Sequence, residues 1–104
     1  MLKLDHIDHV ALTVKDVAAS VAWYRDVLGL ERRHQEAWGD CPAMMCAGAT
    51  GVALFPADGE PAPAPDPRRT ATMRHLAFHA DGANFVRAQA ALAARGIEIG
   101  RAHV

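Results

Sequence analysis

The chain has 104 residues, 51% of them hydrophobic, and 11 Lys and Arg against 12 Asp and Glu give a formal net charge of −1 at pH 7. This length suits one small domain, and the balanced charge excludes the strongly basic surface typical of proteins that bind nucleic acids or anionic membranes. The N-terminus turns polar at once and no apolar run is long enough to span a bilayer. We therefore expect a cytoplasmic protein.

The first third of the chain predicts a strand, a helix and a second strand. The alternation from Ile7 to Val14 indicates a strand with His9 on one face and an apolar row on the other, formed by Val10, Leu12 and Val14. Asp16 is expected to cap a helix that Gly29 ends. A strand with an exposed, charged face is then expected over Leu30–Ala37.

Two short apolar strands and a linker should follow. Ala43–Ala47 predicts the third strand, and Gly48 and Gly51 flank a hairpin turn into the fourth, Val52–Phe55. Five of the six prolines lie between positions 56 and 69. Because proline donates no ladder hydrogen bond, residues 57–70 predict an extended linker.

The second half repeats the first in outline. A strand is expected over Met73–Ala80, with Leu76, Phe78 and Ala80 on its buried face. A helix is expected over Asn84–Arg95, ended by Gly96, with a buried stripe of Phe85, Ala88 and Leu92. Ile97–Ile99 would begin a further strand.

The repeat places a histidine at the start of one strand in each half. The interval from His9 to His75 matches that from Gly29 to Gly96 to within one residue. Neutral imidazole is a common ligand of divalent metals, so the matched pair His9 and His75 predicts a metal site between the halves. The alternative is that both are strand histidines with satisfied hydrogen bonds. His79 would lie ~13 Å from His75 along the same strand, too far for the same ion.

Other reactive or large side chains are expected to be structural. Cys41 and Cys46 have no second cysteine pair to complete a zinc site, and we expect both as reduced, packed thiols. Four large apolar side chains are candidates for lining a substrate cavity, although core packing is the favoured role for most of them: Trp38, Met44, Met45 and Phe55.

Three segments together resemble the vicinal oxygen chelate superfamily: Ile7–Val14, Trp23–Leu30 and Arg74–Phe78. This superfamily includes glyoxalase I, extradiol dioxygenases, fosfomycin-resistance thiol transferases and bleomycin-binding proteins. The resemblance implies an α+β fold of paired βαβββ modules. The first module would span residues 1–56, the linker 57–70, and an incomplete second module 71–104.

The resemblance also implies a site. His9 and His75 match the two first-strand metal ligands, and no catalytic residue can be assigned. Ala53 stands near the position where glyoxalase I-like members carry a carboxylate. Dioxygenase-like and thiol-transferase-like members use two histidines and one glutamate of the second module, so the alanine favours them. That glutamate would lie in strands that this chain does not contain.

The function implied is that of a metal-dependent dioxygenase, lyase or transferase. A divalent iron, manganese, nickel or zinc ion would bind a small substrate through two adjacent oxygens. Two alternatives remain open: a metal-free protein that sequesters a small ligand, as bleomycin-binding relatives do, and an inactive fragment. Members often build their sites from two chains, and an open sheet exposes unpaired backbone groups, so a homodimer is expected.

The C-terminal hexapeptide Ile99–Val104 is expected not to be native to the gene. With a following stop it is the translation of ATC GGA AGA GCA CAC GTC TGA, which resembles a sequencing-library adapter read in frame. On this hypothesis the authentic sequence departs near Glu98 and continues for about two more strands, including the third ligand. Independent reads of the source DNA that retain the hexapeptide and stop within a genuine gene would refute it.

Overall fold

A computed structural model describes residues 1–100 of the chain. The chain divides into two compact units, Met1–Pro63 and Ala64–Val104, and the boundary falls inside the proline-rich segment. Residues 101–104, which make up most of the C-terminal hexapeptide, lie outside the described residues. No helix in the described part of the chain has the length and apolar character needed to cross a membrane.

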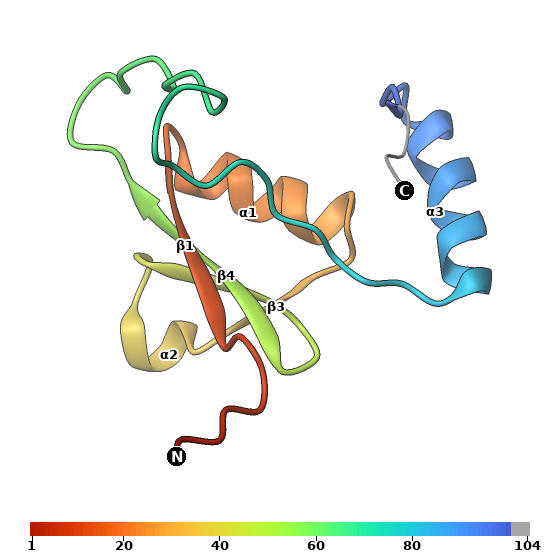
Figure 1. Ribbon diagram of the computed structural model, residues 1–104, viewed down its shortest axis with the longest axis horizontal. Helices are drawn as coiled ribbons and strands as arrows, with labels where there is room; N and C mark the ends of the chain where they lie inside the picture. Colours follow the sequence, from red (N-terminus) through yellow and green to blue (C-terminus); the bar gives the residue numbers. More distant parts are fainter. Residues whose placement is uncertain (101–104) are drawn as a thin grey trace. The chain divides into compact units, whose positions relative to one another are not determined.

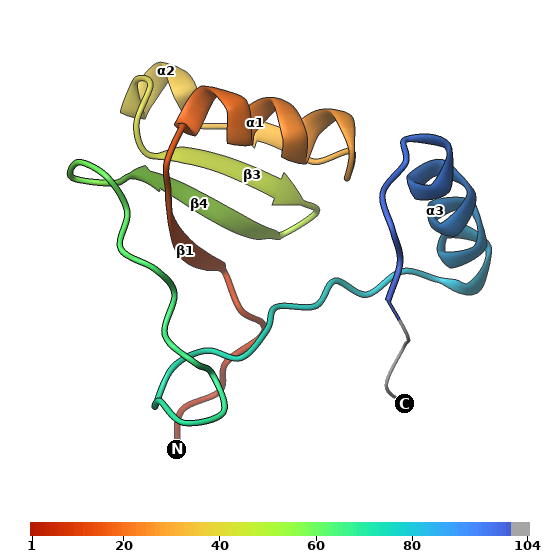
Figure 2. The ribbon, with the colours of Figure 1, turned by 90° about the horizontal axis from the view of Figure 1, so that it is seen from above.

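The first unit is a four-stranded sheet with a helix on one face (Figures 1 and 2). The strand order is β1-β4-β3-β2, in which β1 pairs with β4 in parallel and the other neighbours are antiparallel. In chain order the elements are β1 (His9–Val14), α1 (Val17–Asp26), β2 (Glu31–Arg33), α2 (Gln35–Trp38), β3 (Ala43–Ala47) and β4 (Thr50–Pro56). Apart from the short α2, this is a βαβββ module.

Helix α1 begins and ends as the sequence predicts. The Asp16 carboxylate accepts a hydrogen bond from the backbone N–H of Ala19 at 3.0 Å, which satisfies one of the free donors of the first turn. After the helix, Gly29 adopts a φ of 70°, a conformation that side-chain-bearing residues rarely adopt. This turn leads the chain directly into β2.

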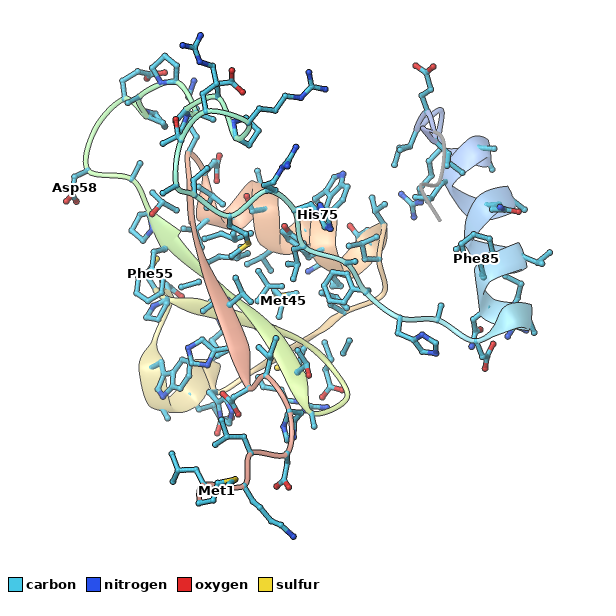
Figure 3. The ribbon with its side chains drawn as sticks, in the orientation of Figure 1. Met1, Met45, Phe55, Asp58, His75 and Phe85 are labelled. Carbon is cyan, nitrogen blue, oxygen red and sulfur yellow. The ribbon has the colours of Figure 1, made fainter. Side chains whose placement is uncertain are left out.

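The core of the first unit lies between the sheet and α1. Met45, Leu54 and Val52 are its largest fully buried side chains, and Met45 lies near its centre (Figure 3). Leu12 and Val14 pack against this cluster from β1, which confirms the predicted apolar row of that strand for these two residues. The sheet therefore has one face covered by α1 and an opposite face that carries His9.

The prediction of a strand over Leu30–Ala37 is wrong beyond Arg33. β2 pairs with β3 for three residues only, and the chain then turns at His34, which has a φ of 66°. The following residues form α2, and the His34 ring lies over the Trp38 ring with centroids 4.9 Å apart. A positive φ cannot continue a pleated strand, so the pairing ends where the backbone changes direction.

Between residues 64 and 100 the second unit contains one helix, α3 (Gly82–Ala94), close to the predicted Asn84–Arg95. The Asp81 carboxylate caps it by accepting a hydrogen bond from the backbone N–H of Asn84 at 2.8 Å. The predicted buried stripe is wrong for Phe85 and Ala88, since both are exposed, Phe85 by 52%. Leu92 is half-buried.

Neither strand predicted for the second unit is formed among the described residues. Met73–Ala80 is extended but has no ladder partner, and Leu76 and Phe78 remain 39% and 43% exposed. Ile97 instead donates its backbone N–H to the Leu92 carbonyl at 2.9 Å, which folds the chain back onto the last turn of α3. A strand is stable only with a neighbour, and residues 64–100 contain none.

Candidate metal-binding face

His9 opens β1 and lies on the sheet face opposite α1, as its sequence parity predicts. Its register partner on β4 is Gly51, and two positions along, Ala11 pairs with Ala53. Ala53 belongs to a second buried cluster with Met44 and Cys46, separate from the core under α1. We call this surface, formed by His9, Ala11, Met44, Cys46, Gly51 and Ala53, the His9 face.

The imidazole of His9 is held by the preceding residue. Its Nδ1 lies 2.8 Å from Oδ2 of Asp8. Because an ionised carboxylate only accepts hydrogen bonds, Nδ1 must donate, and Nε2 is left as the nitrogen with a free lone pair. This hydrogen bond also lowers the pKa of the Asp8 carboxyl from its ordinary value, because it favours the ionised form.

Asp8 is the functional candidate that the sequence analysis did not single out. Metal-binding histidines commonly donate their second ring N–H to a carboxylate, which fixes the tautomer and the ring orientation. The signal in the sequence was an Asp directly before the His that opens a strand. Two hydrogen bonds anchor the backbone here: Gly51 N–H to the Asp8 carbonyl at 2.8 Å, and Thr50 Oγ1 to the Ile7 carbonyl at 3.0 Å.

The rest of the His9 face is apolar and small. Met44 is 5% exposed and Ala53 2%. Because residue 53 is alanine, no carboxylate stands at the position where glyoxalase I-like proteins would have one. A Cβ at Gly51 would lie 2.6 Å from Sδ of Met44, and the glycine therefore lets the methionine lie across β4. Met44 and Ala53 are therefore packed residues of this face.

His75 lies in the second unit, on the extended segment that precedes α3 (Figure 3). The side chain is exposed, as is that of His79. The row of Leu76 and Phe78 that was expected to define its buried face is not covered. His9 and His75 belong to different units, so the shared site of the two histidines stays a prediction.

A complete set of His, Cys and carboxylate metal ligands is not found in the part of the chain that the structure describes. Within residues 1–100, no three His, Cys, Asp or Glu side chains form a group able to hold a metal ion. In the first unit, His9 offers one nitrogen ligand with a carboxylate behind it. The described residues therefore do not complete the three-ligand set that the family resemblance implies.

The cysteines and the large apolar candidates differ in how far they are buried. Both cysteines are free thiols, as expected, but Cys41 is exposed and only Cys46 is packed. Met44 and Met45 are buried on opposite faces of the sheet, which confirms their packing role. Trp38 and Phe55 remain 44% and 41% exposed and do not belong to the core.

Sequence and structure comparisons agree on the relatives of this chain. Residues 6–103 match the Glyoxalase/Bleomycin resistance protein/Dioxygenase superfamily. No curated protein sequence gives a significant match. Among solved structures, a glyoxalase/dioxygenase from Nostoc punctiforme is 27% identical with a TM-score of 0.76, and the match covers 95% of this chain and 75% of that one.

Two further structures show the range of the likeness. A lactoylglutathione lyase from Agrobacterium tumefaciens is 26% identical with a TM-score of 0.67, covering 97% of this chain and 77% of that one. A genomically encoded fosfomycin resistance protein from Listeria monocytogenes shares the fold at 18% identity, with a TM-score of 0.64 and coverage of 98% and 75%. With nearly the whole sequence matched, the chain belongs to the Glyoxalase/Bleomycin resistance protein/Dioxygenase superfamily.

Proposed function

We propose that this chain is part of a metal-dependent enzyme that acts on a small, oxygen-chelating substrate, with His9 and His75 as metal ligands. The observation that supports it most is the hydrogen bond from His9 Nδ1 to Asp8, 2.8 Å long, which leaves Nε2 free to bind an ion. The His9 side chain is 45% exposed, so an ion can reach it.

The residue at position 53, on the same sheet face as His9, favours one class of reaction over another. Ala53 supplies no carboxylate, which favours a dioxygenase-like or thiol-transferase-like reaction over that of the lactoylglutathione lyase among the relatives. The metal would be iron, manganese, nickel or zinc, because imidazole suits iron, nickel and zinc, and the carboxylate of the implied third ligand also suits manganese.

Metal titration tests the proposal. We expect calorimetry with Ni²⁺, Mn²⁺ and Zn²⁺ to give one site per chain, formed by His9 and His75. His9→Ala and His75→Ala should each weaken binding by more than the ~10–100-fold that loss of an outer-shell partner costs. The matched controls are His6→Ala and His79→Ala, which remove exposed histidines nearby in the sequence and should leave affinity unchanged. Full affinity in either of the first two variants refutes the shared site.

A metal-free binding protein is the second candidate. It is favoured by the lack of a three-ligand group within residues 1–100 and by the apolar character of the His9 face. In that case chelator-treated protein should bind metal-free bleomycin, and the titration of His9→Ala should match that of the unmodified chain. Loss of binding after chelation would instead support the metal-dependent enzyme.

We also propose that the chain forms a homodimer. Among the described strands, β1 bonds only to β4 and β2 only to β3, so both edges of the sheet carry unpaired backbone donors and acceptors. Pairing with a second copy satisfies these groups and covers apolar surface. Size-exclusion chromatography with light scattering at micromolar concentration should give the dimer mass, and a stable monomer would contradict the proposal.

A further inference from the structure

Two sulfur atoms lie close together above the backbone of β4. A Cβ built at Gly51 would lie 2.6 Å from Sδ of Met44 and 3.1 Å from Sγ of Cys46. The two sulfur atoms are therefore no farther apart than the sum of these two lengths. Two sulfurs bound to one metal ion, at ~2.3 Å each, lie at most about 4.6 Å apart. A small rotation of the unbranched Met44 side chain is thus enough to bring both sulfurs onto one ion.

His9 flanks the same glycine from the other side. Gly51 pairs with His9 on β1 and with Cys46 on β3, so these residues form one row across the sheet, and the middle residue has no side chain. Neighbouring strands lie ~4.8 Å apart, so the backbones of His9 and Cys46 are about 10 Å apart, a span that an imidazole, a metal ion and a thiolate bridge together. The hydrogen bond from Nδ1 to Asp8 leaves Nε2 of the ring free.

The three donor atoms suit a soft monovalent ion. Thiolate and thioether sulfurs are ligands that Cu⁺ prefers, and imidazole also binds copper. Cys46 loses its proton when a metal binds, so the thiolate and a monovalent ion are together neutral, whereas a divalent ion leaves a net positive charge. Neutrality matters because Met44 and Cys46 are only 5% and 9% exposed, and an uncompensated charge is costly at a buried site. The Glu31 carboxylate, in the same row on β2, is balanced by Arg33 at 3.7 Å.

We propose that Cys46, Met44 and His9 form a site for a soft monovalent metal ion, Cu⁺ or its analogue Ag⁺. Sγ of Cys46 and Sδ of Met44 hold the ion, and Nε2 of His9 is the third ligand. His9 is 45% exposed, so the ion enters from its side of the row. On binding, the thiol releases its proton to water and no electron is transferred. The site lies within the first unit, shares only His9 with the proposed oxygen-chelate centre and does not require His75.

Silver titration of the Cys41→Ser chain tests the site, because this variant lacks the other, exposed thiol. In chloride-free buffer we expect one Ag⁺ per chain by native mass spectrometry. The NMR signals of the Met44 methyl group and of Nε2 of His9 should shift, whereas the Met45 methyl group should not. Bound silver with an unmoved Met44 methyl signal overturns the proposal, since the thiol alone would then hold the ion.

Matched methionine variants separate coordination from packing. Met44 and Met45 are neighbours on β3, and both are buried, on opposite faces of the sheet. Met44→Leu keeps the volume but removes the sulfur, and it should weaken Ag⁺ binding by at least the ~10-fold that loss of an outer-shell partner costs. Met45→Leu should leave the affinity unchanged, and Cys46→Ala should abolish binding. Equal silver affinity in the two leucine variants refutes the assignment.

A second pair of measurements distinguishes this site from the proposed oxygen-chelate centre. His75→Ala should leave the silver affinity unchanged, and Met44→Leu should leave the Ni²⁺ affinity unchanged. Loss of silver binding in His75→Ala would overturn the soft-metal site, because that site needs no residue of the second unit. Failure of the Ni²⁺ titration with silver binding intact would count against the oxygen-chelate centre alone.

Discussion

Replacing Leu54 with alanine is expected to lower the free energy of unfolding of the first unit by about 2–5 kcal/mol. Leu54 is 0% exposed and lies in the middle of β4, in register with Leu12 on one side and Ala43 on the other. The cavity left between β4 and α1 cannot collapse, because strands bond to β4 on both sides. Small domains have only ~5–15 kcal/mol of stability, so the loss should be large.

Urea unfolding followed by tryptophan fluorescence measures this change. Both tryptophans, Trp23 and Trp38, lie in the first unit, so the signal reports on that unit alone. Leu4→Ala is the matched control, since Leu4 is 86% exposed and its loss should change stability by less than about 0.5 kcal/mol. Leu54→Val should fall between them and serves if Leu54→Ala does not fold. Equal midpoints for the alanine variants would contradict the core assignment.

Replacing Asp8 with alanine is expected to weaken metal binding ~10–100-fold while leaving His9 in place. The carboxylate fixes the Nδ1–H tautomer, and without it the imidazole divides between two tautomers and turns freely. Asp8→Asn keeps an acceptor oxygen but not the charge and should give an intermediate affinity. Asp5→Ala, an exposed aspartate three residues earlier, is the control and should bind metal normally.

A second measurement does not depend on the metal. Nitrogen chemical shifts of the His9 ring should show Nδ1–H in the unmodified chain and a mixture of tautomers in Asp8→Ala. The pKa of Asp8 is lowered from 3.8, so the hydrogen bond should be fully formed at neutral pH and lost only as the pH falls through that lowered value. Identical tautomers in both proteins would show that Asp8 does not orient the ring.

The first module could be predicted from the sequence because its signals are local or pair within the module. Asp16 caps α1 through a carboxylate three residues from its partner N–H, and Ala43–Ala47 forms β3 with the predicted bounds. The alternation in β1 placed His9 opposite the core, since that face depends only on the period of two. The orientation of the His9 ring was not predicted, because it depends on the hydrogen bond to Asp8 and not on the alternation of side chains along the strand.

The wrong predictions concern segments whose structure depends on pairing or packing with another segment. Apolar and polar residues alternate in Met73–Ala80 as regularly as in β1. This segment nevertheless has no strand beside it within the second unit and does not form a strand. Phe85 lies on a helical stripe that is apolar in sequence but uncovered in the structure. At Leu30–Ala37 the pairing stops after Arg33, where His34 turns the chain.

The sequence by itself determined the family, the βαβββ order of the first module, the caps of its main helix and the face on which His9 lies. These follow from side-chain period, capping chemistry and turn residues, which act within a few positions of the chain. Only the tertiary structure decided that Asp8 orients His9, that the Nε of Arg32 is shielded without a hydrogen-bond partner among residues 1–100, and which apolar rows are covered. The physical reason is that hydrogen-bond satisfaction and burial belong to contacts, and a contact exists only once the chain has folded.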